Sequence, residues 1–370
     1  MHNLYVPPYK ITLFLISFGI TYFSAQVLND KSFPMPDFKL PESKIEISEE
    51  IDNSIQKPEV PWTEVKIQTN GIDRKYGNLV GFHTTIPPEF FVKEEWWKER
   101  IEELLLAGKN ANIYDRKTIV IFPEHIGSGL VLLDEKENFM SQNSLAKALS
   151  KKGDSFDLKK LFYQKSERML DVYIRTFSEL AKQYKVPILG GSIILPNPKM
   201  VRGSIVLDPN GPLYNVSIPF SADGKVMDPL LKKTSLSDLE KEILEPGDTN
   251  QDRVWVVPGW KVAIFIGQEV FVENLYDRLK GRPLDGIVSP AIAYEDMVFG
   301  DKNLNDPNIW QNDGIPKFIK TTKAQDLVQV FSNGSMFERR YDGKTFNLRD
   351  FIHFDRASST DAPVILNLYF

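Results

Sequence analysis

From residue 63 onward, short apolar segments alternate along the chain with segments that carry apolar side chains at helical spacing. Amphipathic helices are expected at 94–107 and 158–184, and a shorter helix at about 270–280. Apolar runs bounded by charged or turn residues predict five strands, at 64–68, 118–122, 186–195, 261–266 and 286–289. Strands that alternate with helices in this way indicate an α/β fold.

Each of the two long helical segments has one apolar face. In the first segment Trp97, Ile101, Leu104 and Leu105 fall on one stripe, and Gly108 is the expected C-cap. In the second segment the side chains expected to face the core are Phe162, Met169, Leu170, Tyr173, Ile174, Phe177 and Leu180. Both helices are therefore expected to pack against a sheet.

Two stretches predict antiparallel pairs of strands. Residues 204–208 and 213–220 are apolar and flank a Pro-Asn-Gly turn, which predicts a hairpin. Residues 328–346 predict a second hairpin, with Asp342 and Gly343 at its turn.

The apolar strands also suggest where the core lies. Residues 363–370 predict a terminal strand, whereas 125–160 and 296–325 follow no sustained period and are expected to be insertions or loops. We interpret residues 63–370 as one domain. Three runs are apolar on both faces and are expected in buried central positions: 118–122, 188–195 and 262–266.

Residues 1–25 are predicted to be a signal peptide or a membrane anchor rather than part of the fold. Lys10 precedes an apolar run at 11–25, which as a helix spans only about 22 Å, short of the roughly 30 Å hydrocarbon core. Cleavage after Ala25 would put the bulky Phe23 at the −3 position, so an uncleaved anchor through 11–25 stays open.

Residues 26–62 mix proline with charged side chains and show no sustained period, which predicts a linker or an arm on the surface. Together with the leader, this arrangement predicts export of the protein. The expected location is periplasmic or extracellular, either soluble or tethered to a membrane through 11–25.

Composition narrows the range of functions. With 45 Lys and Arg against 50 Asp and Glu, the formal net charge is -5, and such a balance argues against nucleic acid as the main partner. There is no cysteine, which excludes disulfides, thiolate metal sites and a cysteine nucleophile. No metal or cofactor is expected, because Gly190-Gly191 is too short for a dinucleotide loop and no metal-ligand spacing links His2, His83, His125 and His353.

Three segments carry candidate chemistry, in a fixed order along the chain. Residues 119–130 form an apolar strand that ends in Phe-Pro-Glu, and in 228–248 a lysine is followed by an acidic helical patch and Pro-Gly-Asp. Residues 262–290 read as a strand, a tight turn, a helix and a strand that ends in Ser-Pro. This ordered set resembles the carbon–nitrogen hydrolase (nitrilase) superfamily over about 63–370.

The resemblance implies a four-layer α-β-β-α sandwich and a Glu–Lys–Cys triad. In that family a Cys thiolate attacks an amide or nitrile carbon, Glu transfers the proton, and Lys donates to the developing oxyanion. By this resemblance Glu124 takes the base position, Lys233 the oxyanion position and Glu240 the position of a second acid. A shift by one residue, to Lys232, stays open.

The position of the nucleophile departs from the family pattern. Gly267 stands where the resemblance places the Cys, and glycine has no side chain with which to attack. We therefore expect a pseudoenzyme that retains a Glu/Lys pocket for a small amide- or acyl-type ligand or a partner. The alternative is an active hydrolase or acyltransferase that uses another nucleophile, such as Ser289, or a water activated by Glu124.

Each candidate residue also has a purely structural interpretation. The alternatives are a solvated charge for Glu124, a surface cation for Lys233 and a turn glycine for Gly267. His125 is adjacent to Glu124 and is interpreted as a loop residue. The family commonly forms homodimers, so a homodimer is an expectation by analogy.

Overall fold

The computed structural model describes residues 65–135, 157–336, 339–358 and 362–370. The predicted leader at 1–25 and linker at 26–62 lie outside these residues. Within the described ranges, none of the helices combines the length and the apolar character that crossing a membrane requires.

The first of two large sheets is mixed. Its strand order is β1, β21, β2, β3, β4, β9. β1 runs parallel to β21, β2 to β3 and β3 to β4, whereas β21 is antiparallel to β2 and β9 to β4. The strands are β1 (Lys66–Asn70), β2 (Asn78–His83), β3 (Thr118–Ile121), β4 (Ile188–Leu189), β9 (Pro219–Phe220) and β21 (Val364–Tyr369).

The second large sheet is also mixed. Its order is β11, β12, β13, β16, β19, β20, with β12, β13 and β16 parallel and the other pairs antiparallel. The strands are β11 (Val254–Val257), β12 (Trp260–Ile264), β13 (Gly286–Ala291), β16 (Asp326–Phe331), β19 (Phe346–Arg349) and β20 (His353–Arg356).

The two sheets pack face to face through a largely apolar layer. Leu79 and Ile121 from the first sheet lie in one buried cluster with Ile264 and Val328 from the second. At Gly81 on β2 the sheets approach so closely that a Cβ would lie 2.8 Å from methyl groups of Val328 and Val330. Burial on both faces explains why β3, for example, is apolar at consecutive positions rather than at alternate ones.

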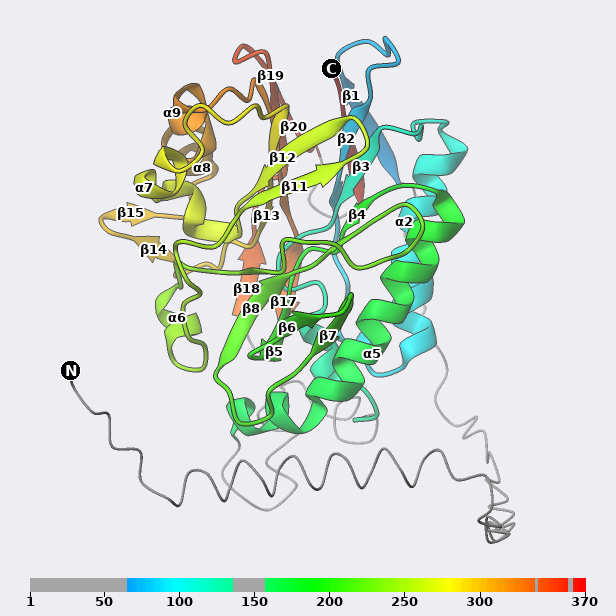
Figure 1. Ribbon diagram of the computed structural model, residues 1–370, viewed down its shortest axis with the longest axis vertical. Helices are drawn as coiled ribbons and strands as arrows, with labels where there is room; N and C mark the ends of the chain where they lie inside the picture. The colour runs from blue at the N-terminus through cyan, green and yellow to red at the C-terminus, as the bar shows by residue number, and fades with distance from the viewer. Residues whose placement is uncertain (1–64, 136–156, 337–338, 359–361) are drawn as a thin grey trace, which may run out of the picture. The chain divides into compact units, whose positions relative to one another are not determined.

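Helices cover both outer faces, so the architecture has four layers, α-β-β-α (Figure 1). Helices α2 (Glu94–Asn110) and α5 (Leu158–Tyr184) cover the first sheet, where Trp97 meets Phe177 edge to face at 5.7 Å and Phe177 packs against Phe220. Helices α7 (Glu273–Asp277), α8 (Pro307–Asp313) and α9 (Ile315–Phe318) cover the second.

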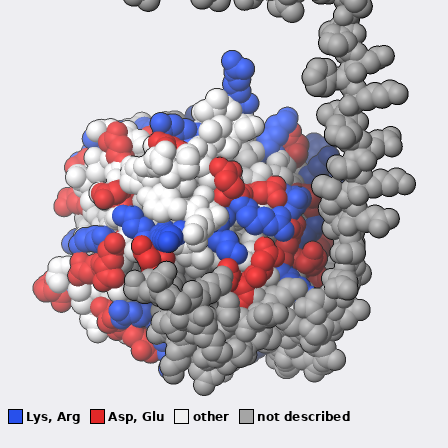
Figure 2. Space-filling model, turned by 90° about the horizontal axis from the view of Figure 1, so that it is seen from below, with Lys and Arg blue, Asp and Glu red and all other residues white. Residues whose placement is uncertain are grey.

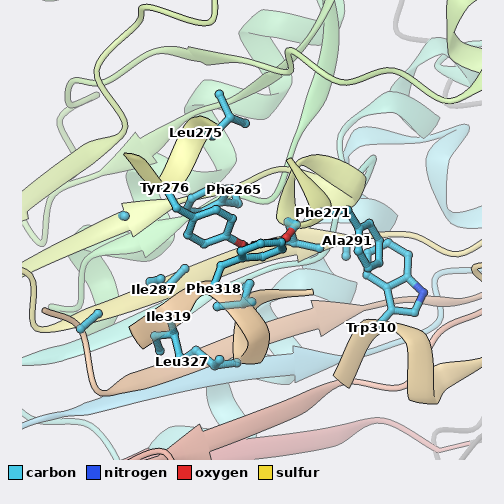
Figure 3. Close-up of a cluster of buried hydrophobic side chains, with 14 of the residues drawn as sticks. Phe265, Phe271, Leu275, Tyr276, Ile287, Ala291, Trp310, Phe318, Ile319 and Leu327 are labelled. Carbon is cyan, nitrogen blue, oxygen red and sulfur yellow. Dashed lines mark hydrogen bonds between the residues drawn. The ribbon is translucent and has the colours of Figure 1, made fainter. Parts of the chain in front are cut away.

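Aromatic side chains fill the outer layer of the second sheet. Tyr276 of α7 stacks on Phe265 at 4.5 Å and on Phe318 of α9 at 5.0 Å (Figure 3). Trp310 of α8 packs against Phe271 and meets Phe331 of β16 edge to face. The segment 296–325, expected to be a loop or insertion, therefore forms part of this helical layer.

Smaller elements surround the two sheets. A three-stranded sheet has the order β10, β8, β5, and three further pairs form hairpins. These strands are β5 (Ile193–Pro196), β8 (Leu213–Ser217) and β10 (Leu231–Lys232), then β6 (Lys199–Val201) with β7 (Ser204–Val206), β14 (Val298–Phe299) with β15 (Lys302–Asn303), and β17 (Asn333–Met336) with β18 (Arg339–Asp342). The short helical elements are η1 (Pro88–Phe91), η2 (Ser128–Leu132), α6 (Asp238–Lys241), η3 (Gly267–Phe271) and η4 (Ile319–Thr321).

The helix predicted at 158–184 is confirmed, and its ends have clear physical causes. The Asp157 carboxylate accepts a hydrogen bond from the Lys160 amide as N-cap, and Lys185 ends the helix in the left-handed region with φ 56°. The predicted C-cap at Gly108 is wrong, because α2 continues to Asn110. Gly108 is small because Tyr114 packs directly against it.

The two predicted hairpins are paired differently from the expectation. β7 pairs with β6, and β8 pairs with β5 and β10, so 204–208 and 213–220 do not form a hairpin. In the other stretch β16 pairs with β19, and β17 with β18, which puts Asp342 and Gly343 between strands that do not pair with each other.

The predicted central strands are buried, with one correction. β3, β4 and β12 occupy inner positions in the two large sheets. The run 188–195, however, divides into β4 and β5 around Gly190 and Gly191, and β5 lies at the edge of the three-stranded sheet, although its residues are buried.

Candidate functional site

The candidate site lies where strands from both large sheets end. Glu124 follows β3 by three residues, and Gly267 follows β12 by three residues. Lys233 directly follows β10 of the small sheet. Because β3 and β12 belong to sheets that pack face to face, these three positions from distant parts of the chain come together.

Lys233 connects two buried carboxylates. Its Nζ donates to Glu124 Oε1 at 2.8 Å and to Glu240 Oε2 at 2.6 Å, and its side chain is fully buried. Lys232 points elsewhere, since its Nζ donates to Asn197 Oδ1 at 2.9 Å and lies over the Tyr214 ring. The structure therefore brings Lys233, and not Lys232, to Glu124.

A capping motif positions Glu240. The Ser237 Oγ accepts a hydrogen bond from the Glu240 amide, and Glu240 Oε2 accepts from the Ser237 amide at 2.9 Å. This reciprocal arrangement is the capping box of the four-residue helix α6. The same Oε2 accepts from Lys233, so the local motif delivers a carboxylate to the buried ammonium.

His125 and Asn215 belong to the same cluster, although neither was predicted there. Asn215 Nδ2 donates to Glu124 Oε1 at 2.9 Å and to Glu240 Oε1 at 3.1 Å. His125 Nε2 lies 3.5 Å from Glu240 Oε1, and its Nδ1 lies 3.0 Å from Ser128 Oγ. His125 is a loop residue, as interpreted from the sequence, since it lies between β3 and η2, and its side chain belongs to the cluster.

The signals for these two residues were weak. His125 adopts a φ of 60°, which is uncommon outside glycine and has no signature in the sequence. Asn215 is fully buried in the apolar strand β8. A polar amide within an apolar strand was the one signal that could have identified it.

Gly267 adopts a conformation that favours glycine, and a side chain on it would require the Glu124 carboxylate to shift. Its φ is 54°, in the left-handed region. A Cβ built on it would lie 2.5 Å from Glu124 Oε2 and 3.0 Å from Lys233 Nζ. The Glu124 carboxylate therefore fills the space that a side chain at position 267 would need.

A buried ion pair ties the turn at Gly267 to the segment after Lys233. Arg253 Nη1 pairs with Glu269 Oε2 at 2.8 Å, and the other carboxylate oxygen accepts from the Thr234 amide at 2.6 Å. Glu269 Oε2 also accepts from the Ile266 amide at 2.8 Å. Neither Arg253 nor Glu269 was predicted. The two residues are 16 positions apart, so no local sequence pattern links them, and Arg253 directly precedes β11.

The charges of the cluster shift the pKa values of its members. Burial raises the pKa of Glu124 above its ordinary value, and Lys233 only partly opposes this. Burial acts against the charges of Lys233 and Glu240 as well. The paired carboxylates nevertheless hold the pKa of Lys233 above its usual range, and Lys233 with His125 holds that of Glu240 well below its own.

Two cavities adjoin the cluster. One, of about 10 Å³, is bordered by Glu124 and His125 and is about as large as a single water needs. The other, of about 200 Å³, is bordered by His125 and Glu240. His125 is the member of the cluster that lines both of the cavities described here.

Ser289, the alternative nucleophile, is not brought to the cluster. It is buried on β13, and its Oγ accepts a hydrogen bond from Gln329 Nε2 at 3.3 Å. Its neighbours two positions away, Ile287 and Ala291, pack in the outer layer with the helices. Since alternate residues of a strand share a face, Ser289 faces that layer.

The described residues contain one grouping with the geometry of a metal site. Ligand atoms of Glu124, His125 and Glu240 all lie within 4.8 Å of one another. The Lys233 ammonium already pairs with both carboxylates. This donor set therefore fits an ammonium rather than a metal ion.

Comparisons with known proteins place the fold. No family model matches the sequence, and no curated protein matches it. A carbon–nitrogen hydrolase from Helicobacter pylori G27 superposes with a TM-score of 0.55 at 15% identity, covering 79% of this chain and 88% of that chain. A mutant amidase from Nesterenkonia sp. AN1, carrying acrylamide added at its active-site cysteine, gives 0.53 at 12% identity, covering 80% and 92%.

A second mutant of the Nesterenkonia amidase, described as a nitrilase-superfamily protein, also gives a TM-score of 0.53 at 12% identity, covering 80% of this chain and 92% of that chain. The expected resemblance to the carbon–nitrogen hydrolase superfamily is thus confirmed for the fold. The four-layer α-β-β-α sandwich is confirmed with it. Catalytic roles for Glu124, Lys233 and Glu240 stay predictions.

Proposed function

We propose that this chain, which has the fold of the nitrilase superfamily, is an exported protein that no longer hydrolyses C–N bonds. Its role is to bind a small amide- or acyl-type ligand beside the cluster of Glu124, Lys233 and Glu240. The observation that carries the proposal is the close contact at Gly267. A Cβ on this residue would lie 2.5 Å from Glu124 Oε2.

The chemistry of acyl transfer supports the loss of activity. The similar amidase from Nesterenkonia sp. AN1 has an active-site cysteine, whereas this chain contains no cysteine. Removing the nucleophile from a catalytic triad lowers turnover by about 10⁶-fold in the best-studied protease. Here the carboxylate expected to activate a nucleophile lies where a Cβ of residue 267 would be, 2.5 Å from it.

The features that remain are those of a binding site. The cavity of about 200 Å³ beside Glu240 has a mainly apolar lining with a few polar side chains, which is the usual make-up of a small-molecule site. The net charge and the mixed charges on the face in Figure 2 favour a small ligand over nucleic acid.

Export is the second part of the proposal, and it rests on the sequence of residues 1–25 and 26–62. Fractionation of cells that produce the full chain with a C-terminal tag tests it directly. We expect the tagged protein in the periplasm, in the medium or on the membrane. Recovery of the unprocessed chain in the cytosol would refute export.

Turnover assays test the loss of activity. Purified protein is incubated with small aliphatic and aromatic amides and esters, and product is compared with a no-protein blank and with Glu124→Gln. We expect the same background in all three. Product above the blank that disappears in Glu124→Gln would overturn the proposal.

One observation favours a second candidate, hydrolysis by an activated water. Glu124 Oε2 is buried without a hydrogen-bond partner, and the adjoining cavity of about 10 Å³ is about as large as a water needs. A carboxylate whose pKa is raised by burial is a suitable general base. In that case Lys233 would stabilise the oxyanion, and turnover would fall as pH drops through the pKa of Glu124.

A further inference from the structure

We infer that the cavity of about 200 Å³ beside Glu240 and His125 binds a small apolar amine in its protonated form. The inference rests on the proposed function for the location of the pocket, and it replaces the amide-type ligand with an amine. It is carried by three observations: the apolar lining, an excess of carboxylate over free cation, and a carboxylate oxygen, Glu240 Oε1, with room for a further donor.

The size and lining of the cavity fit a ring or short chain with a small head group. A dry cavity of about 150 Å³ lined by aliphatic and aromatic side chains is known to take up benzene. This cavity is somewhat larger, at about 200 Å³. Its apolar lining consists of Leu158, Phe162, Ile194, Leu239, Ile243, Leu244 and Tyr294.

The charges around the cavity favour a cation. Glu240 and Glu242 both line it, and Glu242 is exposed. Arg339 is the basic side chain among the described lining residues, and it is already paired with Asp296. Among the described lining residues, there is thus no unpaired Lys or Arg to neutralise the carboxylates of Glu240 and Glu242.

The cluster behind the cavity does not remove this excess. Lys233 supplies one positive charge to the two carboxylates of Glu124 and Glu240. Its ammonium is held on Glu240 Oε2, so Oε1 of the same carboxylate is left for Asn215 and His125. A cation near Oε1 would meet a carboxylate that is ionised at neutral pH, because the pKa of Glu240 lies well below its ordinary value.

Hydrogen-bond counting gives the same answer. Asn215 Nδ2 donates to Glu240 Oε1 at 3.1 Å, and His125 Nε2 lies 3.5 Å from the same oxygen. A carboxylate oxygen has two lone pairs, so Oε1 has room for a donor from the cavity beside the hydrogen bond from Asn215.

An ammonium group meets each of these conditions. It carries three donors and no acceptor, and it gains from a desolvated carboxylate and from nearby aromatic rings. Phe162 and Tyr294 supply such rings in the lining. A neutral amide can donate an N–H to Glu240 Oε1, but it lacks the positive charge that an ionised carboxylate favours.

The experiment compares benzylamine with benzamide, which share the ring and differ in the head group. Binding to the purified full chain is measured by calorimetry at neutral pH. We expect benzylamine to bind about tenfold more tightly than benzamide, the difference expected for a hydrogen bond to a charged group. Benzamide binding as tightly or more tightly would overturn the inference and leave the proposed amide-type ligand standing.

Variants locate the site. Ile243→Phe fills the cavity without touching the charged cluster, and Ile352→Phe makes the same change at a site that is 76% exposed. We expect benzylamine binding to be lost in the first variant and unchanged in the second. Equal binding by Ile243→Phe and the wild type would place the amine elsewhere and overturn the inference.

Glu240→Gln tests the charge itself. In a folded variant we expect the preference for benzylamine over benzamide to fall to about one, because the ionised acceptor is gone. A preference that survives in folded Glu240→Gln would contradict the assignment. Amide turnover by the wild type would refute the proposed function alone, since amine binding is measured independently.

Discussion

The carboxylate of Glu124 occupies the space that a side chain on Gly267 would require. An ideal Cβ on Gly267 lies 2.5 Å from Glu124 Oε2, a distance that Cβ atoms essentially never show, and 3.0 Å from Lys233 Nζ. The φ of 54° at Gly267 adds a conformational preference for glycine. Both the backbone and the neighbouring carboxylate thus favour glycine at position 267, which we propose corresponds to the nucleophile position of the superfamily.

The first prediction separates these two effects. Gly267→Ala is expected to lower the free energy of unfolding by about 2–4 kcal/mol, from the left-handed backbone and the overlap with Glu124 together. Gly300→Ala has a similar φ of 62° with nothing within 4 Å of its Cβ, and is expected to cost only about 1 kcal/mol. Urea denaturation measures both, and equal losses would show that Glu124 does not restrict position 267.

The second prediction concerns the buried ammonium. Lys233→Met leaves the carboxylates of Glu124 and Glu240 buried without their cation, and is expected to cost about 3–5 kcal/mol. Lys232→Met is the matched control, since its side chain donates to Asn197 outside the cluster. Denaturation of both variants at neutral pH tests this, and a similar small loss in each would mean that the cluster contributes little.

The third prediction is a pH dependence at Asp326. Burial raises the pKa of Asp326 to about 6, above the value of about 3.9 that an Asp has in an unfolded chain. The contribution of this carboxyl group to the free energy of unfolding is therefore complete below about pH 3.9 and declines as pH rises through about 6. Asp326→Asn keeps the acceptor for the Asp350 amide and removes the ionisation. We expect the variant to match the wild type near pH 3.5 and to exceed it by about 1–2 kcal/mol at pH 7.5, after allowance for solvent screening.

The control for this experiment is Asp301→Asn, which makes the same substitution at an exposed position. Thermal unfolding across the pH range measures all three proteins. A difference between Asp326→Asn and the wild type that stays constant with pH would contradict the raised pKa.

Part of the site could be predicted because its residues follow apolar strands directly. Glu124 and Gly267 each come three residues after a strand that is buried on both faces, and such strands are visible in the sequence. His125, Asn215 and Arg253 could not be predicted in the same way. Their contacts depend on how separate segments pack, and Asn215 and Glu124 are 91 residues apart.

The fold was predictable to a similar extent. The long helix at 158–184 has a strong period and a polar N-cap, and both are local features. The pairing of β7 with β6 rather than β8 is not local, since β8 lies between β5 and β10. The central strand β2 (Asn78–His83) was missed, because Asn78, Gly81 and His83 interrupt its apolar run.

The most direct test of the central claim is intact-protein mass spectrometry after incubation with an activated ester. The wild type is expected to gain no acyl adduct within the time in which Gly267→Cys gains one, because only the variant has a thiol, placed beside the Lys233 ammonium that favours the thiolate. Ile352→Cys, at an exposed position, supplies the rate of an ordinary thiol, which Gly267→Cys should exceed. A site-specific acyl adduct on the wild type would contradict the account, because it would reveal a working nucleophile in a chain without cysteine.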